Sequence, residues 1–176
     1  MTEVRPLAPA EAHIERLVTW LVRIINDAYA IGEAGLWLDG ATRTDAVEIA
    51  EAIKSGEMLL ATGDGRIEGC ARVQPLTETT ADLGMLAVTP ERWGGGAGRV
   101  LVHTAEELMS SRGVTTMQLE LLVPMGWVHP EKKRLRDWYT RLGYEVTRSA
   151  SFDDVAAHLR PQLRVPCEFL IFHKRL

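Results

Sequence analysis

Four glycines stand within five positions, at 94, 95, 96 and 98, between an apolar run and an amphipathic segment. The apolar run 81–90 predicts a strand that ends at Pro90. The amphipathic segment predicts a helix that ends near Gly113, with Leu101, Val102, Ala105, Leu108 and Met109 on one face. A second strand is predicted at 114–123, so the chain must contain a βαβ unit with a glycine turn at the start of its helix.

The glycine turn has a chemical use, because the start of a helix presents unpaired N–H groups and a partial positive charge. A loop without side chains lets a phosphate reach those donors, so an anion cradle is one interpretation. The alternative is a tightly packed turn with no ligand. The segment has no Lys-Ser/Thr ending and no GxGxxG spacing, which argues against nucleoside triphosphate and dinucleotide sites.

The rest of the chain alternates helix and strand patterns. A helix is expected from Ile14 to Ala28, and Thr42 or Thr44 is expected to cap a second helix over 45–56. The Asp64-Gly65 pair predicts a tight hairpin turn. Further strands are expected at 3–7, 57–63, 66–76, 144–148 and 167–176, and further helices at 131–142 and 152–159.

Size and composition limit the classes of protein. The 176 residues suit a single domain spanning 1–176, and a net charge of −4 gives no basic field for nucleic acid or an anionic membrane. Charged residues interrupt every long apolar stretch, so no signal or membrane segment is expected and a cytoplasmic location is predicted. Cys70 and Cys167 are expected to be small core residues, and no metal site is predicted.

Two motifs resemble a known family, the GNAT superfamily of acyl-coenzyme-A-dependent N-acyltransferases. The segment "LAVTPERWGGGAGRVLV" resembles its first motif and "KRLRDWYTRLGYEV" its second. The resemblance implies an α+β fold with a mixed, mostly antiparallel sheet of about seven strands flanked by helices. It also implies acetyl-CoA as co-substrate and transfer of its acetyl group to a primary amine of a small molecule.

The resemblance assigns the acetyl-CoA contacts. The cofactor pyrophosphate falls on Gly94, Gly95, Gly96, Ala97, Gly98 and Arg99. The pantetheine arm and thioester oxygen fall on backbone donors of Leu86, Ala87 and Val88. Most of the family has Gln or Arg where this chain has Trp93, which leaves the main chain as the expected source of phosphate donors.

Two side chains are candidates for proton transfer. Tyr139, within "WYTRLGY", takes the family role of general acid toward the departing thiolate, and the alternative is an ordinary packing tyrosine. Glu120 shares a strand face with Gln118 and Leu122, so it either looks into the substrate cleft as a base or is a surface carboxylate. A chain of water molecules is a further alternative for the base.

Acceptor recognition is expected from two loops that combine tryptophan with charge. The candidates are Glu33, Trp37 and Arg43 in the first loop, and Trp127 and His129 in the second. For each, a loop-anchoring role is the alternative. A homodimer is left open, as are an inactive acyl-CoA-binding module of the same fold and a transferase for a larger acyl group.

Overall fold

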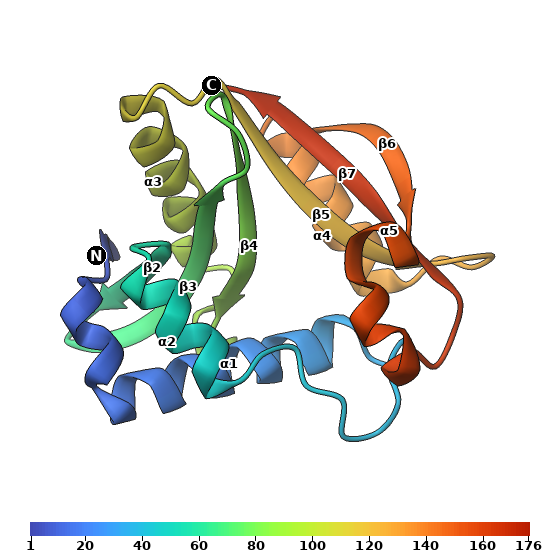
Figure 1. Ribbon diagram of the computed structural model, residues 1–176, viewed down its shortest axis with the longest axis horizontal. Coiled ribbons are helices and arrows are strands. Elements are labelled where there is room, and N and C mark those ends of the chain that lie inside the picture. The colour runs from blue at the N-terminus through green and yellow to red at the C-terminus, as the bar shows by residue number, and fades with distance from the viewer.

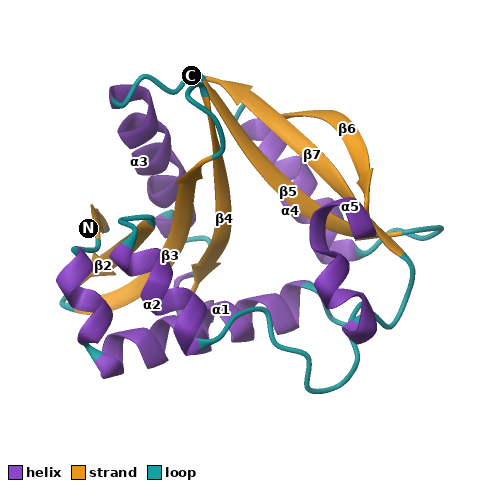
Figure 2. Ribbon diagram, viewed as in Figure 1, coloured by secondary structure: helices purple, strands orange, loops and turns teal.

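The computed structural model describes residues 1–176, and its centre is one seven-stranded sheet in the order β1-β2-β3-β4-β5-β7-β6 (Figures 1 and 2). The strands are β1 (Glu3–Pro6), β2 (Met58–Gly63), β3 (Arg66–Pro75), β4 (Thr80–Val88), β5 (Thr116–Pro124), β6 (Glu145–Ser151) and β7 (Cys167–Arg175). The helices are α1 (Glu15–Gly32), α2 (Ala46–Lys54), α3 (Ala97–Ser111), α4 (Pro130–Arg141) and α5 (Phe152–Ala156).

The sheet is mixed, since β4 and β5 are parallel and all the other neighbours are antiparallel. The parallel pair is joined by α3, which is the predicted βαβ unit. The hairpin between β2 and β3 turns at Asp64 and Gly65, whose φ values of 52° and 72° fit the predicted tight turn. The α+β architecture expected from the sequence is therefore confirmed.

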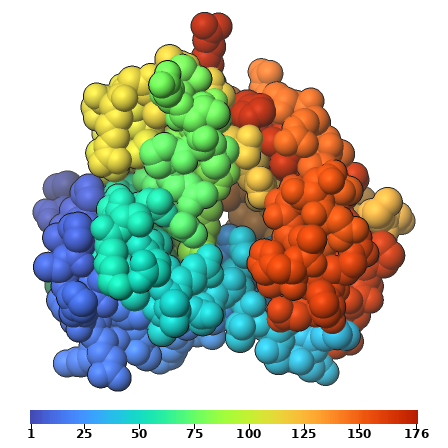
Figure 3. All heavy atoms as spheres, viewed as in Figure 1, coloured from blue at the N-terminus to red at the C-terminus, as the bar shows by residue number.

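The parallel pairing of β4 and β5 is short. It consists of three residue pairs, from Thr80↔Thr116 to Asp82↔Gln118, and the strands separate beyond that point. Figure 1 shows the result as two wings, β1–β4 and β5–β7–β6, which meet near the C-terminus and diverge toward α1. In the space-filling view the divergence is a recess between the wings (Figure 3). The open edge of β4 faces this recess.

Helices cover both faces of the sheet. One core cluster joins α1 and α2 to β2–β4, and its members from α1 are Val18, Leu21, Ile24 and Ile25. A second cluster joins α3 to the other face, where α4 adds partly buried side chains. A third lies beneath α5 against β5–β7. No helix has the length and apolar character needed to cross a bilayer.

Two helix boundaries differ from the sequence prediction. The N-cap of α2 is Asp45, whose side chain accepts a hydrogen bond from the amide of Glu48, and the hydroxyl of Thr44 instead donates to the Glu48 carboxylate at 2.8 Å. The helix predicted over 152–159 ends early, and a 3₁₀ segment, Ala157–Gln162, replaces its second half. Pro161 lies inside that segment, where it cannot donate a backbone hydrogen bond.

The burial of α3 against the sheet yields a stability prediction. Leu101 is fully buried, so Leu101→Ala removes apolar contacts and leaves a cavity, and we expect a loss of about 2–5 kcal/mol in the free energy of unfolding by urea. The control is Val47→Ala on α2, where the side chain is 72% exposed and the change should be within about 0.5 kcal/mol. Equal effects of the two changes would contradict this packing.

Candidate active site

The glycine turn precedes the N-terminus of α3, where several backbone N–H groups have no acceptor. Gly94 and Gly96 have φ values of 78° and 92°, and Gly96 is the N-cap of α3. No backbone or side-chain acceptor within the chain receives the amides of Gly94, Gly96, Ala97, Gly98 and Arg99. Five N–H groups are thus available at the positive end of the α3 dipole, an arrangement that suits a phosphate or diphosphate.

The glycines are needed for conformation more than for space. A Cβ on Gly94 or Gly96 would meet no heavy atom within 4 Å, but both positions lie in the left-handed region that side chains disfavour. A Cβ on Gly95 would lie 3.1 Å from the carbonyl oxygen of Arg92. The turn therefore depends on glycine to aim its amides outward.

Arg99 is held by a hydrogen-bonded chain on the exposed side of α3. Its Nε donates to Nε2 of His103 at 3.3 Å, and Nδ1 of the same imidazole lies 3.3 Å from the Glu106 carboxylate. Since Nε2 accepts, Nδ1 is the donor to Glu106. The remaining guanidinium donors of Arg99 are left free on the first turn of the helix, beside the cradle.

Trp93 fills the position where the family usually has Gln or Arg. Its indole Nε1 donates to the carbonyl oxygen of Val88 at 2.8 Å, and the Arg134 guanidinium lies 5.9 Å from the ring centroid. The ring is 44% exposed. The residue thus joins the turn to the end of β4 and adds no charge to the cradle.

The open edge of β4 supplies further main-chain donors. The amide of Thr89 bonds to Glu68 on the β3 side, so strand alternation directs the amide of Ala87 to β3 as well. The amides of Leu86 and Val88 then point to the recess. A bulge at Met85, whose φ is 48°, precedes them. Of the three residues expected as donors, the geometry favours Leu86 and Val88.

Tyr139 extends from α4 into the same region. Its ring packs against Tyr144 and Phe172, with centroid separations of 6.2 and 6.0 Å, and its hydroxyl forms no hydrogen bond within the protein. Burial raises the pKa of the Tyr139 phenol, and the nearby Tyr29 and Asp82 add to the rise. The phenol therefore stays protonated at neutral pH, as a proton donor must.

Glu120 is exposed on β5 and faces the recess. Gln118 donates to its carboxylate at 3.3 Å, and His173 in turn contacts the Gln118 carbonyl oxygen at 3.1 Å. Loss of hydration between the diverging strands raises the pKa of Glu120, while Arg43 and Arg148 oppose the rise. Glu120 follows Gln118, the partner of Asp82, by two residues on the same face of β5, at the point where β4 and β5 separate.

Asp82 is a candidate that the sequence analysis did not identify. It is the last β4 residue in the parallel pairing with β5, and its Oδ1 is buried with no hydrogen-bond partner. Burial raises the pKa of Asp82 to about 7, and the Glu120 carboxylate contributes to the rise. A carboxyl group that titrates near neutral pH is suited to accept a proton from an ammonium group.

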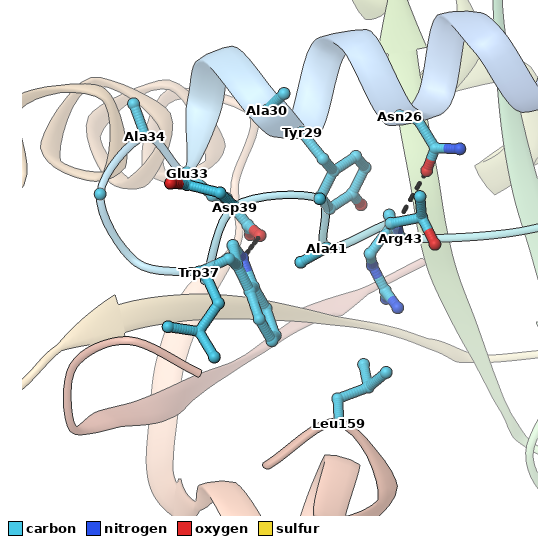
Figure 4. A pocket seen from close by; sticks show the side chains of 14 residues that line it. Asn26, Tyr29, Ala30, Glu33, Ala34, Trp37, Asp39, Ala41, Arg43 and Leu159 are labelled. Carbon is cyan, nitrogen blue, oxygen red and sulfur yellow. Dashed lines mark hydrogen bonds between the residues drawn. The ribbon is translucent and has the colours of Figure 1, made fainter. Parts of the chain in front are cut away.

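A cavity of about 230 Å³ lies beneath the loop that follows α1 (Figure 4). Three of the predicted acceptor residues, Glu33, Trp37 and Arg43, line it. Tyr29 lines it as well, with the guanidinium of Arg43 5.2 Å from its ring centroid. Arg43 also opposes the rise in the pKa values of Asp82 and Glu120, although neither carboxylate lines the cavity.

Glu33 has structural partners inside this region. Its carboxylate pairs with Lys132 of α4 at 2.7 Å, and both side chains are only 5% exposed. The indole Nε1 of Trp37 donates to the same carboxylate at 2.5 Å. Glu33 thus ties the end of α1 to the start of α4, and its lone pairs are engaged within the protein.

The second predicted loop lies outside the cavity. His129 is buried, and its Nε2 donates to the carbonyl oxygen of Ala34 at 3.0 Å, while its Nδ1 has no partner. Trp127 is 47% exposed, and its ring lies 5.5 Å from that of His129. Neither residue lines the cavity, so the structure assigns His129 a contact with the first loop.

The comparison with protein families agrees with this geometry. The family model described as Acetyltransferase (GNAT) domain matches residues 54–146, which is more than half of the chain. This range includes the cradle, the open edge of β4, Asp82, Glu120 and Tyr139. The chain therefore belongs to the GNAT acetyltransferase family and is an acyltransferase.

Solved structures share the fold at low sequence identity. A putative acetyltransferase of the GNAT family from Desulfovibrio desulfuricans is 20% identical, with 99% of each chain covered and a TM-score of 0.67. The PaiA N-acetyltransferase of Thermoplasma acidophilum, solved with coenzyme A, is 17% identical, with 100% of this chain and 99% of that chain covered and a TM-score of 0.72. The ribosomal-protein-S18-alanine N-acetyltransferase of Escherichia coli is 17% identical, with 99% and 94% covered and a TM-score of 0.67. No curated protein matches the sequence closely.

The buried pair of Glu33 and Lys132 yields a second stability prediction. Lys132→Met leaves the Glu33 carboxylate without its cation in a buried site, and we expect a loss of about 3–5 kcal/mol in the free energy of unfolding. The adjacent Lys133 is a matched control, because its ion pair with Asp137 is exposed and Lys133→Met should change little. Adding Glu33→Gln to Lys132→Met should recover part of the loss, and an equal response to both lysine changes would overturn this interpretation.

Proposed function

We propose that the protein transfers the acetyl group of acetyl-CoA directly to a primary amine of a small molecule. The observation that carries the proposal is the set of five free amides at the start of α3, next to a strand edge left open by the divergence of β4 and β5. The free amides suit the diphosphate of acetyl-CoA, and the open strand edge suits its amide-bearing pantetheine arm. The coenzyme A in the T. acidophilum structure supports the choice of donor.

The reaction needs three contributions from the chain. The amides of Leu86 and Val88 are placed to align the thioester and polarise its carbonyl oxygen. Asp82 and Glu120 take the proton that the acceptor ammonium must lose before its nitrogen attacks. As the C–N bond forms and the C–S bond breaks, the Tyr139 phenol gives its proton to the thiolate sulfur. The second proton that the nitrogen loses on becoming an amide passes to solvent, and solvent reprotonates the phenol.

The size of the cavity supports a small acceptor. Its volume of about 230 Å³ is below the range of about 300–1,000 Å³ typical of ligand pockets. The family also offers the alternative of a protein acceptor, since the E. coli relative is named for a ribosomal protein alanine. Arg43 and Tyr29 are half-buried in the cavity wall, which favours a small molecule whose polar groups can contact both.

The test is release of free thiol from acetyl-CoA on addition of an amine, with acetyl-CoA binding followed by calorimetry. We expect turnover with at least one class of amine, and Tyr139→Phe should lower kcat by a factor of about 10²–10⁴ with acetyl-CoA affinity nearly unchanged. The lost hydroxyl bonds to no other protein group, so stability should also be retained. Tight acetyl-CoA binding without turnover over a wide amine panel would instead indicate a binding module.

Asp82 gives the reaction a predicted pH dependence. Asp82 must be deprotonated to accept a proton, so activity should rise with pH through about 7. Asp82→Asn should lower kcat/KM and remove this rise from the pH–activity profile. The raised pKa also affects stability, because the folded state holds the proton up to about 7 and the unfolded chain releases it near 3.8. The ionised Asp82 should therefore destabilise the fold increasingly as pH rises from about 4 to 7.

Stability and activity should consequently change in opposite directions in Asp82→Asn. Urea unfolding should show the variant to be more stable than the parent protein at pH 8, with the difference vanishing near pH 4. Asp27→Asn on the exposed face of α1 serves as the control for loss of a carboxylate. If Asp82→Asn keeps the kcat/KM of the parent protein and the same rise of activity with pH, proton acceptance belongs to Glu120 alone.

A further inference from the structure

Arg43 is the one charged residue lining the cavity that has no ion-pair partner. The two acids in the lining are both engaged, Glu33 with Lys132 at 2.7 Å and Asp39 with Arg164 at 2.6 Å. No carboxylate of the chain lies within 4.0 Å of the Arg43 guanidinium. Burial opposes the charge of Arg43, but Tyr29, Glu33 and Glu48 outweigh this cost and raise its pKa. Because neither of these carboxylates forms an ion pair with the guanidinium, its donors remain open to a ligand anion.

The position of Arg43 is fixed by its neighbours. The side-chain oxygen of Asn26 accepts from the amides of Arg43 and Thr44 at 2.8 and 3.1 Å, and its nitrogen donates to the carbonyl oxygen of Thr44 at 3.0 Å. The guanidinium lies over the ring of Tyr29, and in Figure 4 it extends from the loop into the space above Leu159. A guanidinium held in this way presents a preorganised fork of donors for a carboxylate.

Two carboxylates lie on one face of the sheet where β4 and β5 part. Asp82 of β4 pairs with Gln118 of β5, and Glu120 follows two residues along the same strand face. Burial raises the pKa values of both carboxyl groups, and Arg43 opposes the rise without forming an ion pair with either. Oδ1 of Asp82 is buried without a partner. The site therefore holds a cation on the loop side and carboxylates on the sheet side, separated by more than an ion-pair distance.

We propose that the acceptor is a free amino acid, or a similarly small zwitterion, whose carboxylate binds Arg43 and whose amine lies beside Asp82 and Glu120. The inference rests on the proposed function and specifies its substrate class. An ammonium between the two carboxylates is where its proton must be lost for transfer. The carboxylate of the same molecule then reaches back to the loop, so one small ligand satisfies both sides of the recess.

Peptide N-termini and polyamines are alternative acceptors, and they would interact differently with Arg43. The N-terminus of a peptide carries an amide in place of the carboxylate, and a polyamine carries only positive charge. Both would leave the Arg43 guanidinium unpaired, and a polyamine would place a second cation near it. The observed arrangement favours the zwitterion over either of these.

The experiment compares free L-amino acids with their α-carboxamides as acceptors in the thiol-release assay. The pair differs in one charge, and the carboxamide imitates a peptide N-terminus. We expect kcat/KM to be higher for the best free amino acid than for its carboxamide by a factor of about 10–100, the range for a hydrogen bond to a charged group.

Variants of Arg43 test whether this side chain causes the preference for free amino acids over carboxamides. Arg43→Met should abolish the preference chiefly by raising KM for the free acid, so that kcat/KM falls more for the free acid than for the carboxamide. Arg43→Lys keeps the charge and loses the paired donors, so it should retain an intermediate preference. Arg23→Met on the exposed face of α1 is the matched control and should leave both acceptors unaffected.

The possible failures are distinguishable. If the parent protein acetylates carboxamides, peptides or polyamines as well as free amino acids, or if Arg43→Met keeps the preference, the substrate class is wrong while the proposed function stands. If no amine of any series releases thiol and calorimetry shows no acetyl-CoA binding, the proposed function itself fails. Calorimetric binding of free amino acids to the coenzyme-A-loaded protein, weakened by Arg43→Met, supports the inference independently of turnover.

Discussion

The short parallel contact between β4 and β5 is the constraint on which the rest of the molecule depends. The two strands share three residue pairs, and each then follows a different partner, β3 on one side and β7 on the other. Main-chain groups that a continuous sheet would consume are left open along β4. The carboxylates of Asp82 and Glu120 are brought together at the point of separation, because they belong to the two strands that part there.

Recognition of the two substrates draws on different parts of the chain. The donor side is built from backbone, with glycine conformations at Gly94 and Gly96 and with free strand amides. The proposed acceptor side is built from side chains on the loop after α1, of which Arg43 is the one charged residue without an ion-pair partner. Backbone donors depend little on side-chain identity, so the fold can keep the donor side while the residues on the acceptor side change.

The sequence predicted the features that local patterns encode. Alternating and helical periodicities located the strands and the main helices, and the glycine run located the start of α3. Asp82 was missed because its burial and its neighbour Glu120 arise only when strands 38 residues apart lie side by side. The pairing of Glu33 with Lys132, 99 residues away, was equally invisible. The cap of α2 was misassigned because Thr42, Thr44 and Asp45 all carry side chains that can cap a helix.

The hydrogen-bonded chain behind Glu120 reaches the rim of the sheet. His173 on β7 contacts Gln118 on one side and the hydroxyl of Thr147 on the other, at 2.8 Å. Thr147 is the extra residue of a bulge in β6, an edge strand whose outer side pairs with nothing. Fraying of that outermost strand would free the imidazole and then the amide that steadies Glu120. The hydrogen bonds thus connect the edge strand of the sheet to the carboxylate that faces the recess.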